Sequence, residues 1–471
     1  MAIRFYNTLT RRIEDFSPLK EGEVRMYTCG PTVYDFAHIG NYRTYMFEDL
    51  LRRYLKYKGY KVIQVMNITD VDDKTIKGAR EEGIELDDYT AKYKKAFFED
   101  IDTLRIERAE HYPEATKHID VMVELIKKLI DKGYGYRGED GSYYYRVTKF
   151  DNYGKLSGKR LDKLQTTERM KRDEYSKEEI YDFALWKAWD QEDGDVFWET
   201  ELGKGRPGWH IECSAMSMNY LGESFDIHTG GIDNIFPHHE NEIAQSEGGT
   251  GKRFVKYWLH SAHLIVEGKK MSKSLGNFYT LRDILERGYS ARAIRLLLLS
   301  THYRQTLNFT FAELEAAQNN CEKFAEFLHS IQHFADQALK PNPAFKKIVN
   351  ESLTGFENSL DDDLNISAAL GFIFTGMRKI NTILRGSGIS VDDAEMVKGF
   401  MNKINTVLDV LPEEMTVPQE IVALVRERED ARKNKDYQKA DEIRDLLQTK
   451  GYIIEDTPKG TLFRKRMGSG K

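Results

Sequence analysis

Four side chains of the types that bind zinc are spread along this chain. His238 and Glu242 stand four positions apart, so on a helix their side chains project from one face and can share one metal ion. Cys29 and Cys213 would add two thiolates, which completes a donor set suited to zinc. The residues alone leave open a structural or surface role for the histidine and a core position for each cysteine.

A second group of candidate residues, at positions 38–41, has the types that bind a nucleotide phosphate. The segment follows an expected strand and precedes an expected helix, where free backbone N–H groups bind phosphate and Gly40 lets the backbone approach closely. His38 can donate a hydrogen bond to a phosphate oxygen, and Asn41 can hydrogen-bond a phosphate or a ribose. An ordinary turn is the alternative for these four residues taken alone.

Two lysines three positions apart, Lys270 and Lys273, lie in segment 269–277 among serines and a glycine. Such a segment suits a mobile loop that closes over a triphosphate, where both ammonium groups would neutralise charge on the leaving pyrophosphate. The alternative is a solvated lysine-rich loop, although the ordered run Lys-Met-Ser-Lys-Ser at 270–274 is rarer than such loops in general.

The elements expected around these residues place them at one edge of an α/β sheet. Residues 24–28 and 62–66 have apolar strand patterns, and residues 42–57 between them carry apolar side chains at helical spacing. This order predicts a parallel pair of strands joined by a right-handed crossover. A doubly wound, Rossmann-like sheet binds its ligand beyond the carboxyl ends of its strands, which is where Cys29 lies.

The pattern changes along the 471 residues, which are too many for one hydrophobic core. A turn-rich connection at 203–208 is expected to lead out of an insertion, and a strand at 224–228 and a helix at 238–247 then continue the α/β pattern. Apolar residues at three-and-four spacing predict a helical bundle, with helices at 311–339, 366–384 and 394–411 and breaks at 341–343 and 386–388.

A linker is expected at 412–418, followed by a charged helix or helix pair at 421–450 and two short strands near the C-terminus. The chain is therefore expected to have six segments. They are the first half of a Rossmann-like catalytic domain (1–117), an inserted connective segment (118–205), the second catalytic half with the metal-binding helix (206–250), a lysine-loop and stem-contact region (251–310), the helical bundle (311–412) and a small C-terminal mixed module (413–471).

Composition excludes several classes of protein. An apolar content of 40% with 31% charged residues is typical of a globular enzyme, and three cysteines are too few for a disulfide framework. No apolar run reaches the length of a membrane span, and the first residues lack the core of a signal peptide, so a cytoplasmic location without membrane contact is expected. Cys321 lies on an expected bundle helix and is expected to be buried and inert.

The net charge of −6 gives no general attraction for nucleic acid, but a local basic surface is compatible with it. The candidate basic residues are Arg426, Arg428, Arg432, Lys433, Lys435 and Lys439. Acidic residues are interspersed among them, which weakens the indication of nucleic-acid binding.

The two nucleotide-binding segments, in this order and at this separation, resemble the paired signature of class I aminoacyl-tRNA synthetases. One departure is Asn41, where that family usually has a second histidine. Five further segments resemble the cysteinyl-tRNA synthetase family specifically, and the resemblance extends over essentially the whole chain. They are residues 28–35, 67–74, 208–216, 236–242 and 456–461.

The resemblance implies one zinc ion per subunit, held by the residues that match the family's ligands, Cys29, Cys213, His238 and Glu242. The thiolate of the substrate L-cysteine would bind this metal, which separates cysteine from serine without an editing domain. Four protein ligands normally mean a closed zinc site, so the site would become five-coordinate or one ligand would bind weakly. The other residues that the resemblance places in the cysteine site are Thr69, Trp209 and Asp233.

The resemblance also implies a reaction in two steps. ATP with Mg²⁺ activates L-cysteine to cysteinyl-adenylate, and the cysteinyl group then passes to the terminal ribose of tRNA(Cys). Lys273 and His38 would stabilise the transition state of the first step, with no covalent nucleophile, and Gly40, Asn41 and Lys270 would also contact ATP. The bundle and the C-terminal module would bind the anticodon region of the tRNA.

Two alternatives are compatible with parts of this pattern. A relative of the same fold ligates cysteine to an amino sugar in thiol-cofactor biosynthesis, but it lacks an anticodon-binding module, and the residues after 310 argue against it. An RNA-binding or regulatory protein derived from a synthetase should have lost His38, Lys270, Lys273 or a metal ligand, and the chain has all of them. A monomer is expected, because nothing marks a dimerisation helix.

Overall fold

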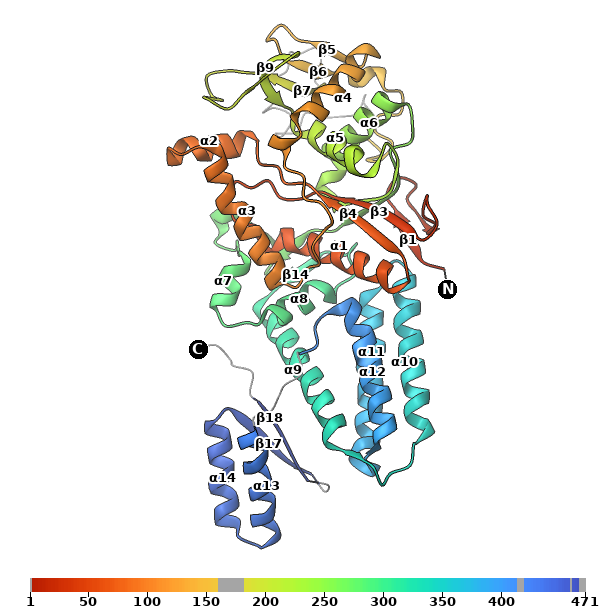
Figure 1. Cartoon of the computed structure of the whole chain (residues 1–471), viewed down its shortest axis with the longest axis vertical. Helices are drawn as coiled ribbons and strands as arrows, with labels where there is room; N and C mark the ends of the chain where they lie inside the picture. The colour runs from red at the N-terminus through yellow and green to blue at the C-terminus, as the bar shows by residue number, and fades with distance from the viewer. Residues whose placement is uncertain (1, 160–181, 413–418, 458–459, 466–471) are drawn as a thin grey trace.

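Four strands from residues 23–261 form a parallel sheet above the helical bundle in Figure 1. The computed structural model describes residues 2–159, 182–412, 419–457 and 460–465. The order of the strands across the sheet is β11 (Val255–Ser261), β10 (Phe225–Gly231), β3 (Glu23–Thr28) and β4 (Lys61–Met66). The three expected strands are present, and the sheet continues past residue 250, the expected end of the second catalytic half, because β11 belongs to it.

Helices cover both faces of this sheet, as expected of a doubly wound fold. The helix α1 (Ile39–Tyr57) connects β3 to β4 and lies on the face that is turned toward the bundle. The opposite face is covered by α4 (Ile119–Asp131), α5 (Trp209–Leu221) and α6 (Glu240–Thr250). Alternate side chains of β3 enter the two cores, since Met26 packs with α1 whereas Tyr27 packs with the helices opposite.

The insertion folds as an antiparallel sheet that lies beyond α4 and α5 (Figure 1). Residues 160–181 of the expected insertion lie outside the described residues. The expectation of a turn-rich connection at 203–208 was wrong, because these residues form β9 between β7 and β8. Gly205 is required there, since a Cβ would lie 2.1 Å from the Lys187 carbonyl oxygen of the paired strand. The strands are β5 (Gly135–Arg137), β6 (Tyr143–Tyr145), β7 (Phe183–Ala188), β8 (Trp198–Thr200) and β9 (Gly203–Pro207).

The helical bundle has one helix more than the sequence predicted. The sequence predicted a break at 341–343, but α10 begins at Pro343. The first turn of a helix tolerates proline, and Asn342 caps this helix. The bundle helices are α9 (Phe311–His333), α10 (Pro343–Asp361), α11 (Ile366–Ser387) and α12 (Val391–Leu408), with the two-residue strands β15 (Ala335–Asp336) and β16 (Ile389–Ser390).

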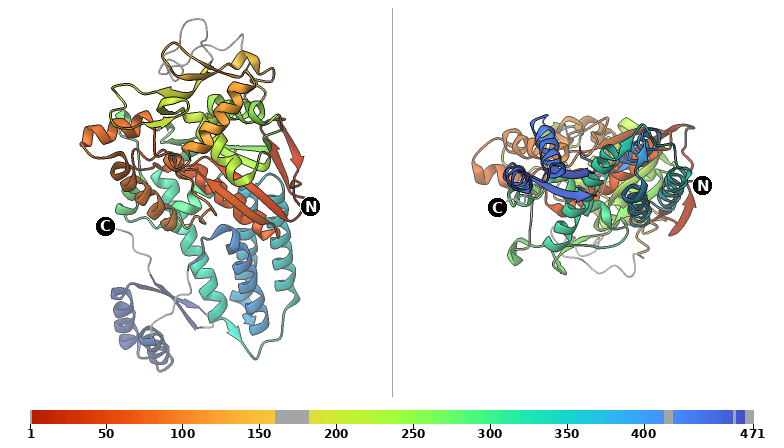
Figure 2. Two further views of the ribbon diagram at one scale, coloured as in Figure 1. Left: turned by 45° about the horizontal axis from the view of Figure 1, so that its top comes forward. Right: turned by 90° about the horizontal axis from the view of Figure 1, so that it is seen from below.

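The C-terminal module consists of two helices and a hairpin, with a small core of its own. It lies beside α9, as both views of Figure 2 show. The expected helix pair and strands are present, whereas residues 413–418 of the expected linker lie outside the described residues. The elements are α13 (Gln419–Lys433), α14 (Tyr437–Thr449), β17 (Tyr452–Thr457) and β18 (Gly460–Lys465).

The remaining elements connect these parts. None of the helices in the described ranges is both long enough and apolar enough to cross a membrane. The connecting elements are β1 (Arg4–Asn7), β2 (Arg12–Asp15), α2 (Asp73–Glu82), α3 (Leu86–Thr103), β12 (Leu264–Val266), β13 (Lys269–Lys270), α7 (Leu281–Glu286), α8 (Ala291–Ser300) and β14 (Leu307–Phe309).

Candidate active site

The four candidate metal ligands come together at the carboxyl end of β3. Cys29 directly follows the strand, Cys213 lies in α5, and His238 and Glu242 come from the segment that starts α6. One ligand atom from each of the four residues lies within 4.8 Å of the others. Residues far apart in the chain therefore form one cluster of two sulfurs, a ring nitrogen and a carboxylate oxygen, which is a donor set that fits a metal ion.

The geometry around Glu242 supports this fit. Its Oε1 atom is buried and accepts no hydrogen bond from the described part of the chain, although His238 Nε2 lies only 3.1 Å away. An imidazole nitrogen and a carboxylate oxygen at this distance suit two ligands of one cation. Oε2 of the same carboxylate pairs with His228 Nε2 at 2.9 Å, which fixes the orientation of the group.

The His238 ring is held in place by its neighbours. Its Nδ1 atom lies 2.9 Å from Nδ1 of His210, which leaves Nε2 directed at the cluster. The Trp209 ring stacks on the imidazole with 4.3 Å between the ring centres. The segment Ile235–His239 that precedes α6 is kinked at Phe236, whose backbone is extended, and His239 already has a helical backbone. The spacing of four between His238 and Glu242 still brings the two side chains together.

A second group of residues around the same place includes His239, which is not among the predicted ligands. Cys29, His228, His239 and Glu242 also have ligand atoms within 4.8 Å of one another. The His239 ring uses both nitrogens, with Nε2 at 3.2 Å from Cys29 Sγ and Nδ1 at 2.8 Å from His260 Nε2. Both nitrogens of His228 also have partners. These two histidines therefore fit the role of supporting the ligands better than that of ligands.

The surroundings of Cys29 disfavour its thiolate form. A hydrogen bond with Cys213, together with burial, raises the pKa of the Cys29 thiol well above its ordinary value. Burial also lowers the pKa of His239 well below its ordinary range, so this ring is neutral at physiological pH. A metal ion that binds here has to displace the thiol protons.

His38 is the N-cap of α1, at the site where the sequence placed a phosphate. Its Nδ1 atom accepts a hydrogen bond from the backbone N–H of Asn41 at 3.2 Å, and the Asn41 Oδ1 atom accepts from the backbone N–H of His38 at 3.1 Å. Burial lowers the pKa of His38, so the ring is neutral, and its proton is on Nε2 because Nδ1 accepts. Asn41 thus has a clear structural role as the second half of a capping box.

The lysine loop, residues 269–277, lies directly against the start of α1, although more than two hundred residues separate the two segments in sequence. The backbone N–H of Ile39 donates to the Tyr279 carbonyl oxygen at 3.0 Å, and Lys273 Nζ lies 2.5 Å from Asp35 Oδ2. A Cβ at Gly40 would lie 2.9 Å from the Cε1 and Nδ1 atoms of His38 and 3.1 Å from Met271 Cε, so a side chain at position 40 would press on both neighbours. Asp35 is not among the predicted site residues, because its pairing with Lys273 depends on this tertiary contact.

The remaining predicted site residues lie at different depths. Lys270 is exposed in β13, and Asp233 is exposed in a short turn after β10. Thr69 is buried and uses its hydroxyl twice, donating to Glu212 Oε2 at 3.0 Å and accepting from Asn67 Nδ2 at 3.1 Å.

The C-terminal module offers less basic surface than the sequence suggested. Arg428 is buried. Its guanidinium donates two hydrogen bonds to the Asp456 carboxylate, at 2.7 and 2.9 Å. Arg432 also pairs with Asp456, and Lys439 lies 2.9 Å from Glu427 Oε1. The inclusion of Arg428 in a surface for nucleic acid was therefore wrong, since its charge stabilises the module itself. Cys321 is buried as expected, and burial raises its pKa to about 12.

Known families match three consecutive parts of the chain. A model of the class I (C) tRNA synthetase catalytic domain matches residues 15–319, and a model of the DALR domain matches residues 355–412. A model of the cysteinyl-tRNA ligase anticodon binding domain matches residues 416–464.

Similar proteins cover nearly the whole chain. A cysteine–tRNA ligase of Protochlamydia amoebophila is 50% identical over 98% of this chain and 98% of its own length, and one of Chlamydia muridarum is 49% identical over 99% and 100%. The methionyl-tRNA synthetase of Mycobacterium tuberculosis, solved with methionyl-adenylate, has the same fold, with a TM-score of 0.62 at 15% identity over 82% of this chain and 88% of its own. The chain belongs to the cysteinyl-tRNA synthetase family of class I aminoacyl-tRNA synthetases.

Proposed function

We propose that this chain ligates cysteine to tRNA, the reaction for which its relatives are named. The observation that carries the proposal is the thiol-containing ligand cluster at the strand ends, next to the joined nucleotide-binding segments. ATP–pyrophosphate exchange that depends on L-cysteine tests the first step, and charging of tRNA(Cys) tests the second. Exchange without charging would favour the amino-sugar ligase, and the absence of both would favour a regulatory protein.

In the first step the cysteine carboxylate attacks the α-phosphate of ATP in line, and pyrophosphate leaves. No covalent bond to the enzyme forms, so positioning and charge stabilisation supply the catalysis. We assign His38 Nε2–H as a donor to a phosphate oxygen at the N-terminus of α1, where Gly40 leaves room for the nucleotide. Lys270 and Lys273 neutralise the leaving pyrophosphate, together with the Mg²⁺ that accompanies ATP.

Selection of cysteine over serine depends on the ligand cluster. Cys29, Cys213, His238 and Glu242 would hold one zinc ion, which when bound supplies a soft Lewis acid that prefers a thiolate to an alcohol. Ordinary pocket contacts separate two substrates of such similar size by only about 1–3 kcal/mol. Trp209 stacks on His238 and so keeps the ring in position. Contacts of Thr69 and Asp233 with the substrate are part of this proposal.

In the second step the ribose hydroxyl at the 3′ end of tRNA(Cys) attacks the adenylate. We assign anticodon recognition to the C-terminal module, because a model of an anticodon binding domain matches it. We propose that the enzyme works as a monomer in the cytoplasm, where tRNA and ATP meet. Light scattering of the purified protein would give the mass of one chain if this is so.

Removal of the C-terminal module is expected to separate the two steps. A chain that ends at Pro412 keeps both large hydrophobic cores, because the core of the module is formed by its own residues, among them Ile421 and Leu447. This truncated chain should retain cysteine-dependent pyrophosphate exchange and charge tRNA(Cys) poorly. Normal charging by the truncated chain would show that the module has another function.

A further inference from the structure

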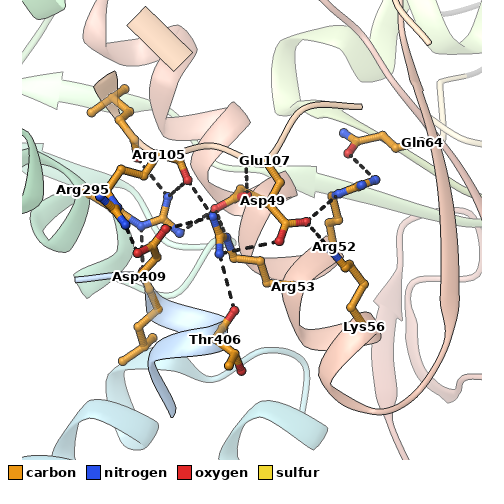
Figure 3. Close-up of polar contacts among 12 residues, drawn as sticks. Asp49, Arg52, Arg53, Lys56, Gln64, Arg105, Glu107, Arg295, Thr406 and Asp409 are labelled. Atoms are coloured by element: carbon orange, nitrogen blue, oxygen red, sulfur yellow. Dashed lines mark hydrogen bonds and ion pairs between the residues drawn. The ribbon is translucent and has the colours of Figure 1, made fainter. Parts of the chain in front are cut away.

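A buried network of charged side chains joins the catalytic domain to the end of the bundle (Figure 3). At its centre Asp49 in α1 and Arg295 in α8 are both fully buried. The Asp49 Oδ2 atom accepts hydrogen bonds from Arg295 Nη2 at 2.5 Å and from Arg53 Nε at 2.8 Å, and its Oδ1 atom accepts from the backbone N–H of Glu107 at 2.8 Å. Each oxygen of this buried carboxylate therefore has a partner, as a stable buried ion pair requires.

The two arginines also bind the carbonyl groups at the ends of two helices. Arg295 donates from Nε to the carbonyl oxygen of Leu408, the last residue of α12, at 2.6 Å, and from Nη1 to that of Leu104, just after α3, at 3.1 Å. Arg53 donates to the carbonyl oxygen of Arg105 at 2.7 Å. Cations at the C-termini of helices satisfy their unpaired carbonyls and interact favourably with the helix dipole.

Asp409 completes the network from the side of the bundle. It follows α12 in the left-handed conformation, with a φ of 50°, and its carboxylate lies 2.9 Å from Arg105 Nε and 3.2 Å from Arg53 Nη2. The chain then runs through Val410 and Leu411, whose backbone N–H groups both donate to Asn405 Oδ1 at 2.9 Å. The path by which the chain leaves the bundle is thus fixed up to Pro412, shortly before the C-terminal module begins.

The same elements lead back to the nucleotide site. The helix α1, which carries Asp49 and Arg53, begins at the N-cap His38. The helix α8, which carries Arg295, follows the lysine loop after α7. One rigid helix therefore has the phosphate-binding turn at one end and the anchor for α12 near the other.

We propose that Asp49, Arg53, Arg295 and Asp409 are positioning residues for the transfer of cysteine to tRNA. They hold the end of α12, the last described element before the C-terminal module, in a defined place relative to the helix that carries His38. A tRNA bound by the module then presents its terminal ribose to the adenylate. This inference rests on the proposed function. It adds the residues that hold the tRNA-binding end of the protein in place relative to the catalytic end.

The test uses the full-length protein with the near-isosteric variant Asp409→Asn. This change removes one charge at the edge of the network and leaves the central pair of Asp49 and Arg295 intact. We expect kcat/KM for tRNA in the charging reaction to fall roughly 3- to 30-fold, the range for residues that couple two sites, while cysteine-dependent pyrophosphate exchange stays at the wild-type rate. A purely structural role would lower both activities together.

Asp362→Asn is the matched control. Asp362 pairs with Arg4 at 2.9 Å, also across the junction of bundle and catalytic domain but outside the network, so this variant should keep both activities. If Asp409→Asn folds poorly, Arg105→Gln removes the other partner of the same ion pair from a more exposed position and should give the same selective loss.

Unchanged charging by both network variants, or an equal loss of exchange and charging, would overturn the inference. Failure of the wild-type protein to exchange pyrophosphate would instead contradict the proposed function. The two failures are therefore distinguishable.

Discussion

The variant Cys213→Ser is expected to lose most of its bound zinc and nearly all cysteine activation, while the fold survives. A serine hydroxyl is a poor zinc donor at neutral pH, and a loss of roughly 100-fold or more is expected because even changes next to the ligands cost 10- to 100-fold. Without the metal, the pocket has little to distinguish a thiol from an alcohol. The fold should persist, because Cys213 contributes one small side chain to a large core.

The measurements are metal content, cysteine-dependent exchange and the spectrum of the cobalt-substituted protein. Wild-type protein with Co²⁺ should gain a thiolate-to-metal absorption band on addition of cysteine and none on addition of serine. Cys321→Ser is the matched control, since Cys321 is also buried but lies in α9, away from the cluster. A zinc-free Cys213→Ser protein that activates cysteine at the wild-type rate would show that the metal is structural.

The variant Lys273→Ala should slow formation of the adenylate by roughly two to three orders of magnitude, the effect of losing one preorganised charge donor. Lys273 is mostly exposed and pairs with Asp35, so its removal should leave the fold intact. Cysteine binding should stay unchanged, because the metal cluster is formed by other elements. Single-turnover measurements of adenylate formation with saturating ATP test this expectation.

Two control variants separate the effect of the Lys273 charge on adenylate formation from the effects of another loop charge and of the ion pair with Asp35. Lys269→Ala removes an exposed charge of the same loop outside the motif and should keep the wild-type rate. Asp35→Asn breaks the ion pair but keeps Lys273, so it should have a much smaller effect if the lysine acts on the phosphates. A wild-type single-turnover rate in Lys273→Ala would remove this residue from the mechanism.

Local elements were predictable where the pattern of residues is local. The strands β3 and β4 and the helix between them follow from the spacing of their apolar residues, and the helix pair and the strands of the C-terminal module were also predicted. The wrong predictions concern proline and glycine, because each of these residue types occurs both in breaks and within regular elements. Pro343 starts α10 rather than interrupting the bundle, and the glycines of 203–208 permit close strand pairing in β9 rather than turns.

The side-chain types that are available for chemistry can be read directly from the residues: the thiols, the imidazole and the carboxylate for a metal, and the two segments for a nucleotide. The sequence also predicted that His238 and Glu242 face the same way, since four residues on a helix set that relation. Such inferences hold because they depend only on side-chain chemistry and on the geometry of one element.

Which distant groups meet depends on how the elements pack in three dimensions. Cys29 reaches Cys213 because β3 ends beside α5, Lys273 meets Asp35 because the lysine loop folds over the start of α1, and Arg428 is buried by a hairpin that follows it in the chain. The partners of Arg295 come from three other segments, and no spacing in the sequence indicates them. Contacts of this kind depend on the packing of whole elements, in which the free energy is shared among many side chains, so no local pattern encodes them.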